Sequence, residues 1–294
     1  MTNEIEPTDE YRYDKLAWPE INEAIEAEKM VLVPVGATED HGHHLPVDVD
    51  REIAGTICEE TAKARDDTLL FPTIDHGYLP HHMDFPGGIT IGWETFVKYV
   101  IDVCVSLAHH GFRKILLVNG HGSNHHLLQQ ATRQVILQYP DVHCANLSWW
   151  EIEEVREVAR EIRDAGPHGT SHAGEMETSI YLHLHPERVD MEQAPKDEHY
   201  PKFSHFNAYD LAGERDPDWS TSASMMEWWS TLSETGTRGD ASVATAEKGE
   251  QFLAAAVAGL HSVLDEFERY PHRDVVDHHV REVADREYDP FRPK

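Results

Sequence analysis

Short apolar runs alternate along the chain with longer amphipathic stretches. The runs have strand length and are bounded by glycine, proline or polar residues, so each is predicted to be a buried β-strand. They cover residues 29–37 (KMVLVPVGA), 69–74 (LLFPTI), 114–120 (KILLVNG) and 142–148 (VHCANLS).

The stretches between the runs carry apolar residues every three or four positions, a spacing that predicts helices. They cover residues 51–65, 93–111, 123–139, 150–164, 174–185 and 244–270. Strands that alternate with helices in this order indicate an α/β fold.

Residues 190–240 have no clear period and are rich in Pro, Asp, Ser, Trp and Gly. A long irregular region within a compact domain usually serves function or contacts. The 294 residues contain no repeat or linker, and this length is near the upper limit for one hydrophobic core. We predict a single domain over residues 1–294, with its core at about 28–270.

Acidic residues outnumber basic ones by 54 to 25, and the net charge is −29. Without a basic patch the chain is not expected to bind nucleic acid or an anionic membrane. So large an excess repels itself unless salt screens it, which favours a salt-rich cytoplasm over an ordinary acidic cytosol. Three cysteines without a CxxC pattern and an acidic N-terminus without an apolar segment also predict a cytoplasmic protein.

The first polar motif, GATEDHGHHLPVDVD at residues 36–50, connects a predicted strand to a helix. Glu39 and His41 are two residues apart, so in an extended segment both side chains point to one side. Asp50 returns to the same strand end, where it either joins them or caps the next helix. This mixture of carboxylates and imidazole suits Zn, Mn or Fe(II).

Two further motifs also stand before predicted helices. In VNGHGSNHH (118–126), glycines on both sides let the backbone turn tightly and project His121 into the same crevice. In SHAGEMETS (171–179), His172 and Glu175 offer a proton-transfer group and another carboxylate. Alternatively, Glu175 and Glu177 lie in this motif only because acidic side chains in a first helical turn interact favourably with the helix dipole.

Carboxylates and imidazoles that hold two divalent ions can activate a shared water to hydroxide and polarise the carbonyl that it attacks. His172 would then protonate the leaving nitrogen. No GxSxG elbow or Walker loop offers a competing chemistry. The three motifs therefore predict a metal-dependent hydrolase of amide bonds.

Together with ATAEKGE at 244–250, these motifs resemble the creatininase (creatinine amidohydrolase) family, in the family's order from about residue 30 to 265. The resemblance implies a three-layer α/β/α sandwich around a mainly parallel sheet. It also implies two divalent metal ions per subunit (Zn, Mn or Fe), a small-molecule amide substrate and a homo-hexamer built as a trimer of dimers.

The resemblance further implies roles for the predicted ligands. Asp50 would bridge the two ions, Glu39 and His121 would hold one of them, and His41 would hold the other. Ser123 stands where creatininase has one more Glu ligand. In family members with the NGHGxN pattern a Glu within HAGE takes that place, which makes Glu175 the expected fifth ligand.

The substrate-lining residues differ more from creatininase than the ligands do. Gly122, His168 and Ser171 replace a Tyr, a Trp and a Glu, and Trp149 with Trp150 forms either a pocket wall or ordinary packing. We therefore expect a cyclic amide or formamide other than creatinine as the substrate. The alternatives are a formamidopyrimidine-nucleotide deformylase of flavin or deazaflavin biosynthesis, like archaeal members of the NGHGxN/HAGE branch, and a non-catalytic metal-binding assembly protein.

Overall fold

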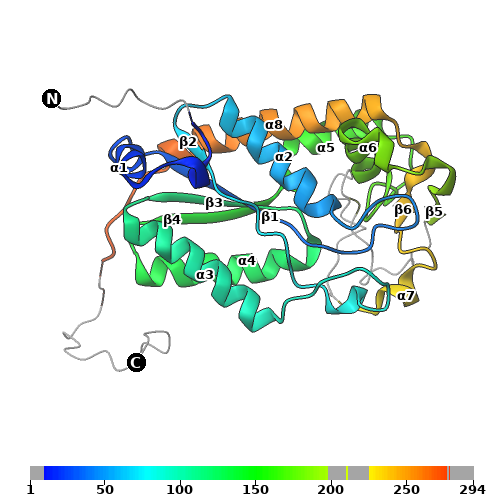
Figure 1. Ribbon diagram of the computed structural model, residues 1–294, viewed down its shortest axis with the longest axis horizontal. Helices are drawn as coiled ribbons and strands as arrows, with labels where there is room; N and C mark the ends of the chain where they lie inside the picture. The colour runs from blue at the N-terminus through cyan, green and yellow to red at the C-terminus, as the bar shows by residue number, and fades with distance from the viewer. Residues whose placement is uncertain (1–9, 198–209, 211–224, 277, 279–294) are drawn as a thin grey trace.

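A four-stranded parallel sheet forms the centre of the protein (Figure 1). The computed structural model describes residues 10–197, 210, 225–276 and 278. The strands lie in the order β2, β1, β3 and β4. Their bounds are Thr68–Leu70 for β2, Met30–Val35 for β1, Lys114–Asn119 for β3 and His143–Ser148 for β4.

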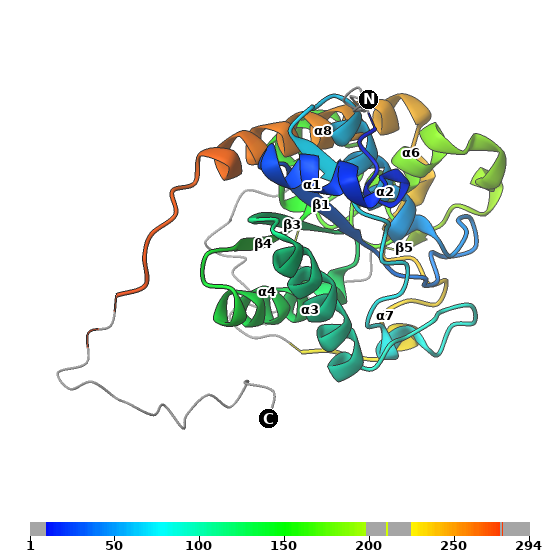
Figure 2. The same ribbon diagram turned by 60° about the vertical axis from the view of Figure 1, so that its left-hand side comes forward.

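Helices cover both faces of this sheet, so the three-layer α/β/α sandwich expected from the family resemblance is confirmed (Figure 1). One face carries α2 (Val49–Lys63), α5 (Glu153–Ile162), α6 (Glu175–Leu184) and α8 (Ala246–Arg269). The other carries α3 (Trp93–His110) and α4 (His125–Gln138), which lie side by side in Figure 2, and α1 (Trp18–Glu26).

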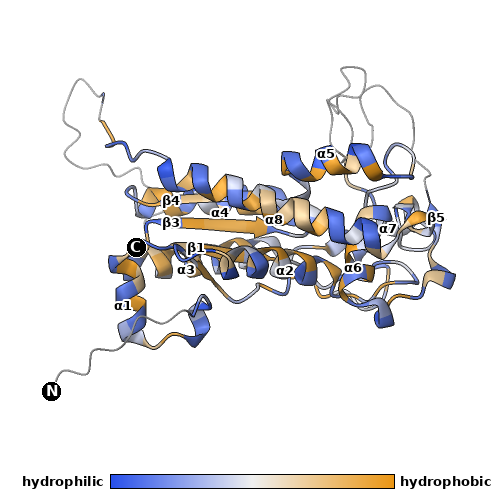
Figure 3. Cartoon of the chain, turned by 90° about the horizontal axis from the view of Figure 1, so that it is seen from above, coloured by the Kyte–Doolittle hydropathy of each residue, from blue (hydrophilic) through white to orange (hydrophobic). Residues whose placement is uncertain are grey.

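Strand β1 shows why the sheet strands are apolar without interruption. Met30 and Leu32 pack into the core under α2, α6 and α8, whereas Val31 and Val33 pack into the core against α3 and α4. Alternate residues of a strand point to opposite faces, so a strand covered on both sides needs apolar residues at every position. Figure 3 shows β3 as a mostly apolar strand between helices that carry polar stripes.

The predicted strands and helices are confirmed with shifts of a few residues at their ends. Strand β2 ends before Pro72, which has no N–H for the ladder, so it is shorter than predicted. Helix α1 is not among the predicted elements. Its signals are Pro19 in the first turn and Glu20, whose carboxylate accepts the backbone N–H of Ala17 at 2.6 Å.

The described part of the irregular region holds two short strands, one short α-helix and the 3-10 helix η6 (Met191–Gln193). Strand β5 (Lys196–Asp197) pairs antiparallel with β6 (Gly239–Asp240), and α7 (Trp229–Leu232) precedes β6. The rest of the predicted irregular region, 198–209 and 211–224, lies outside the described residues. Trp149 is buried in the core under α8, which supports packing rather than a pocket wall.

Seven short 3-10 helices complete the described structure. They are η1 (Tyr13–Lys15), η2 (Pro80–His82), η3 (Gly122–Asn124), η4 (Trp149–Glu151), η5 (Pro186–Arg188), η6 (Met191–Gln193) and η8 (Ala241–Val243). Within the described ranges, no helix combines the length and the apolar character needed to cross a membrane.

Candidate metal centre

The loops that follow β1 and β3 leave the sheet side by side. Val35 at the end of β1 is paired in register with Asn119 at the end of β3. Glu39 and His121 follow these ends closely, and Glu39 Oε1 lies 3.1 Å from His121 Nδ1. The parallel register therefore brings two of the predicted ligands together, at the edge where α/β proteins bind ligands.

Two glycines let helix α2 begin directly against these strand ends. A side chain at Gly120 would place its Cβ 2.2 Å from the backbone oxygen of Asp50, and one at Gly36 would place it 2.4 Å from the Cα of Arg51. No larger residue fits at either position unless the helix moves. Asp50 lies in the first turn of α2, and this close approach delivers it to the site.

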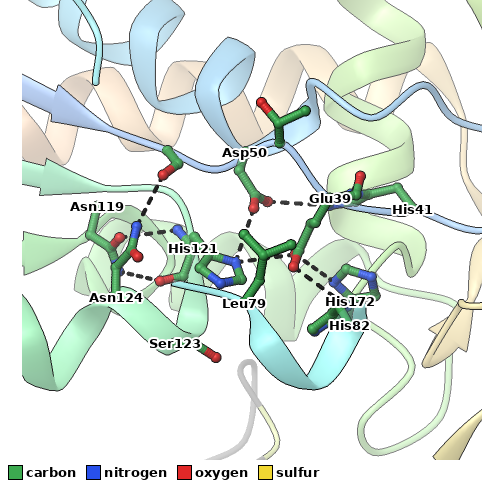
Figure 4. Close-up of polar contacts among 12 residues, drawn as sticks. Glu39, His41, Asp50, Leu79, His82, Asn119, His121, Ser123, Asn124 and His172 are labelled. Carbon is green, nitrogen blue, oxygen red and sulfur yellow. Dashed lines mark hydrogen bonds and ion pairs between the residues drawn. The ribbon is translucent and has the colours of Figure 1, made fainter. Parts of the chain in front are cut away.

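The two carboxylate oxygens of Asp50 face different imidazoles (Figure 4). Oδ1 lies 3.2 Å from Nε2 of His41, and Oδ2 lies 3.1 Å from Nδ1 of His121. Helix α2 begins at Val49, so Asp50 belongs to its first turn and is not the cap that was its alternative interpretation. A carboxylate whose two oxygens face different imidazoles has the geometry expected of a ligand that bridges two ions.

Glu39, Asp50 and His121 provide the first group of ligand atoms, which lie within 4.8 Å of one another. His121 Nε2 lies 3.1 Å from the backbone oxygen of Tyr78. Because a carbonyl oxygen only accepts, Nε2 carries the proton in the neutral ring, and Nδ1 presents its lone pair to the two carboxylates.

His41, His172 and Glu177 provide a second group within the same distance. His41 Nε2 lies 3.8 Å from Glu177 Oε2 and also faces Oδ1 of Asp50. On the other side of the ring, Nδ1 faces the backbone oxygen of Glu39 at 3.4 Å. This carbonyl favours the tautomer that leaves Nε2 free to bind an ion.

His172 belongs to the second group and also faces Glu39 of the first. Its Nε2 donates to the backbone oxygen of Asp40 at 2.9 Å, its Nδ1 lies 3.4 Å from Glu39 Oε1, and its ring centroid is 4.4 Å from that of His41. Burial, and then the neighbouring His41 and His82, lower the pKa of His172 well below its usual value. His172 is therefore neutral and presents the Nδ1 lone pair to the site.

Glu175, the expected fifth ligand, does not belong to these groups of ligand atoms. Its carboxylate is fully buried and accepts the backbone N–H groups of Asp164 at 3.0 Å and Ala165 at 2.9 Å, and it also binds the ammonium of Lys248. Residues two apart on a helix point about 200° away from each other. Glu177, and not Glu175, therefore faces the imidazoles.

His82, which was not among the predicted ligands, also reaches the centre and forms a third group of ligand atoms with Glu39 and His172. Its Nδ1 lies 3.1 Å from Asp40 Oδ1 and 3.4 Å from Glu39 Oε2, and its ring stacks on Trp229 with centroids 4.1 Å apart. No periodicity marks this residue, since it lies on the short helix η2 in an irregular loop. The paired histidines of LPHHMD were its only signal in the sequence.

The charges of the cluster are unbalanced. Burial raises the pKa of Glu39 to about 8 and that of Glu177 to about 7, although neighbouring imidazoles oppose it. Burial lowers the pKa of His41, but Asp50 and Glu177 outweigh it and raise this pKa to about 10. The carboxylates and imidazoles thus compete for protons, because the site contains too little positive charge.

Several polar atoms of the cluster are suited to bind a cation. Glu39 Oε2, His41 Nε2 and Asp50 Oδ2 are buried and have no hydrogen bond of normal geometry within the described residues. Buried polar atoms are usually satisfied, and a divalent ion would satisfy these atoms and supply the missing positive charge. Oxygen and nitrogen donors in this mixture suit Zn, Mn or Fe(II).

The fold and the site thus define an α/β protein with two adjacent carboxylate–imidazole groups at the carboxyl edge of a parallel sheet. Residues 14–264 match the family model described as creatininase, creatinine amidohydrolase. The chain belongs to the creatininase family of hydrolases.

Several characterised relatives are similar over most of their length. A creatinine amidohydrolase from Pseudomonas putida is 29% identical and covers 86% of this chain and 95% of its own. A 3-dehydro-scyllo-inosose hydrolase from Thermotoga maritima is 30% identical, with 90% and 86% covered. A mycofactocin precursor peptide peptidase from Mycolicibacterium smegmatis is 31% identical, with 78% and 82% covered.

Solved creatininases share the fold. A variant in its zinc–zinc form superposes with a TM-score of 0.73 at 27% identity, over 90% of this chain and all of the other. A manganese creatininase gives a TM-score of 0.68 at 25% identity, over 89% of this chain and all of the other. Zinc and manganese are thus the metals of these two creatininases.

Proposed function

We propose that this chain is a two-metal hydrolase. Glu39, Asp50 and His121 would hold one divalent ion, and His41, Asp50 and Glu177 would hold the other. The main observation behind this proposal is that one carboxylate oxygen of Asp50 faces His41 and the other faces His121. When bound, such an ion pair polarises a substrate carbonyl and makes water acidic enough to react near neutral pH.

His172 is placed to move the proton in this reaction. Its Nε2–H is held by the Asp40 carbonyl, so Nδ1 is the nitrogen that faces the site. In hydrolysis of a carbon–nitrogen bond, Nδ1 would take a proton from the attacking water and return it to the leaving nitrogen. His82 and Trp229 pack against this ring, with centroids 5.1 Å and 4.9 Å away, and limit its rotation.

The substrate class that we propose is a non-peptide carbon–nitrogen bond in a cyclic amide or formamide. The support is the resemblance of the motifs and the creatinine amidohydrolase among the relatives. Next to the first group of ligands, Ser123 Oγ lies 3.3 Å from His81 Nε2. Ser123 and His81 would offer hydrogen bonds to a substrate, at a position where creatininase has a Glu ligand.

Metal analysis of three proteins tests the ion site. The wild type is expected to bind two ions per chain, Asp50→Asn to lose both and Glu177→Gln to lose one, because an amide is a much weaker ligand than a carboxylate. Elemental analysis after dialysis with Zn²⁺ or Mn²⁺ measures this. Full metal content in Asp50→Asn would overturn the proposal.

A panel of creatinine, lactams, formamides and short peptides, assayed with the metal-loaded enzyme, tests the reaction. Turnover of a lactam or formamide supports the proposed substrate class, and formate release from a formamidopyrimidine nucleotide would identify a deformylase. Cleavage of peptides alone would contradict the substrate class but leave the ion site intact. No turnover of any member, with both ions bound, would favour a non-catalytic metal-binding protein.

A further inference from the structure

Glu175 and Lys248 form a buried ion pair next to the metal centre. Lys248 lies in the first turn of α8, within the motif at 244–250 that the metal centre does not use. Its ammonium donates to the Glu175 carboxylate, to Asp164 Oδ2 at 2.5 Å and to the backbone oxygen of Val243 at 2.9 Å. All three donors of the lysine are therefore used.

The same carboxylate closes the loop formed by residues 164–174. It accepts the backbone N–H groups of Asp164 and Ala165 at the start of the loop. The backbone N–H of Glu175 donates to the oxygen of Gly169 at 3.0 Å, in the middle of the loop. One residue thus joins the start and the middle of the loop to the first turn of α6.

This loop has an unfavourable backbone conformation. His168 has a φ of 70° and Ala173 a φ of 51°, a region that residues with side chains rarely adopt. Both residues are buried. Such conformations persist only where the surrounding structure imposes them. The loop therefore depends on contacts such as the hydrogen bonds of Glu175.

We infer that Glu175 and Lys248 are positioning residues, whose ion pair holds this loop in the conformation that presents His172 and Glu177 to the ions. The backbone N–H of Ala173 donates to Glu177 Oε2 at 2.6 Å, so the shape of the loop sets the place of that carboxylate. His172 belongs to the same loop. The inference rests on the proposed two-ion site, but Glu175 acts on that site through the loop and not as a ligand.

Glu175→Gln and Lys248→Met test this role with two measurements. Amide hydrogen exchange, followed by mass spectrometry, is expected to be at least about tenfold faster in peptides covering residues 164–174. Calorimetric titration with Mn²⁺ is expected to show that the ion held by His41, Asp50 and Glu177 binds at least about tenfold more weakly. Binding of the other ion should be unchanged. The double variant should be no worse than the more severe single variant, because both changes break one contact.

Arg65→Met is the matched control. Arg65 has the same side-chain exposure as Lys248, 12%, and also binds α8, through Asp265 near the other end of that helix. It should leave loop exchange and Mn²⁺ binding unchanged. If Lys248→Met does not fold, Lys248→Gln keeps an uncharged donor group and is measured in the same way.

Two results would overturn the inference. Loss of one ion from Glu175→Gln, with wild-type Mn²⁺ binding in the lysine variants, would make Glu175 a ligand after all. Wild-type exchange and Mn²⁺ affinity in both single variants would make the pair irrelevant to the site. Failure of the wild type itself to bind two Mn²⁺ ions would instead count against the proposed function, and the exchange measurement would still report on the loop.

Discussion

At the scale of single residues, His172 shows how one backbone contact decides the chemistry of a side chain. The Asp40 carbonyl accepts the proton of Nε2, and burial keeps the ring neutral. In the proposed reaction the ring would therefore act as a base, with Nδ1 toward the candidate ligands. A histidine with the opposite tautomer would present a proton to the same site.

Replacing His172 with Gln should separate ion binding from turnover. The Gln amide can still donate to the Asp40 carbonyl, but it cannot take up a proton. We expect both ions to remain and kcat to fall by about a hundredfold or more, the usual contribution of a general acid–base group. Metal analysis and kinetics on a substrate found with the amide panel measure this, and an unchanged kcat would remove His172 from the reaction.

The candidate ligands differ in how far the sequence could predict them. Glu39, His41 and His121 follow predicted strand ends, and parallel strands bring those ends together, so their proximity was predictable. The choice between Glu175 and Glu177 was not predictable. A helix that began one residue earlier would rotate each side chain by about 100°, and residues 171–179 do not fix that start.

At the scale of elements, the position of α2 against β1 and β3 would set the distance between the two proposed ion positions. Asp50, the proposed bridging carboxylate, is carried by this helix, while Glu39 and His121 follow strands. The helix approaches through two glycines, Gly36 and Gly120. Their role is steric, because neither has a positive φ.

Gly120→Ala should therefore damage the site from a distance. The added methyl group would meet the Asp50 backbone, so we expect α2 to shift, ion affinity to fall and the free energy of unfolding to drop by about 1–3 kcal/mol, as for an overpacked core. Denaturant unfolding and Mn²⁺ titration measure these changes.

Gly122→Ala is the control for this prediction, since a methyl group there meets nothing within 4 Å. Its stability should stay within about 0.5 kcal/mol of the wild type, as for most surface changes. Equal effects of the two substitutions would show that contact with α2 is not the cause.

At the scale of the whole molecule, the net charge of −29 and the buried carboxylates of the site act on stability in different ways. The surface charge is long-ranged and is screened by any salt. The charge of the site is local, and cations bound there would offset it. The two effects can therefore be measured separately.

Salt should stabilise the protein. Screening shortens the range of repulsion from about 10 Å at 0.1 M to about 3 Å at 1 M, so Tm should rise steadily with KCl over this range. Thermal unfolding with the metals bound measures the rise, and NaCl should act like KCl. A flat profile would contradict the interpretation that the chain is adapted to a salt-rich cytoplasm.

Chelation at constant salt should lower the stability. An ion present at a hundred times its Kd contributes about 2.7 kcal/mol, which corresponds to a Tm loss of about 4 °C for each ion removed by EDTA. Adding Mn²⁺ back should restore Tm in the wild type. Restoration in Asp50→Asn to the same degree would place the ions elsewhere.

The hydrophobic pattern alone determined the order of strands and helices, because each element must bury apolar residues at its own period. It also determined that polar motifs stand at the strand ends. Only the tertiary structure decided which side chains in those motifs meet. Glu177 and His82 lie in the site, whereas Glu175 pairs with Lys248. These contacts depend on helix rotation and loop shape, which the hydrophobic period of a segment does not determine.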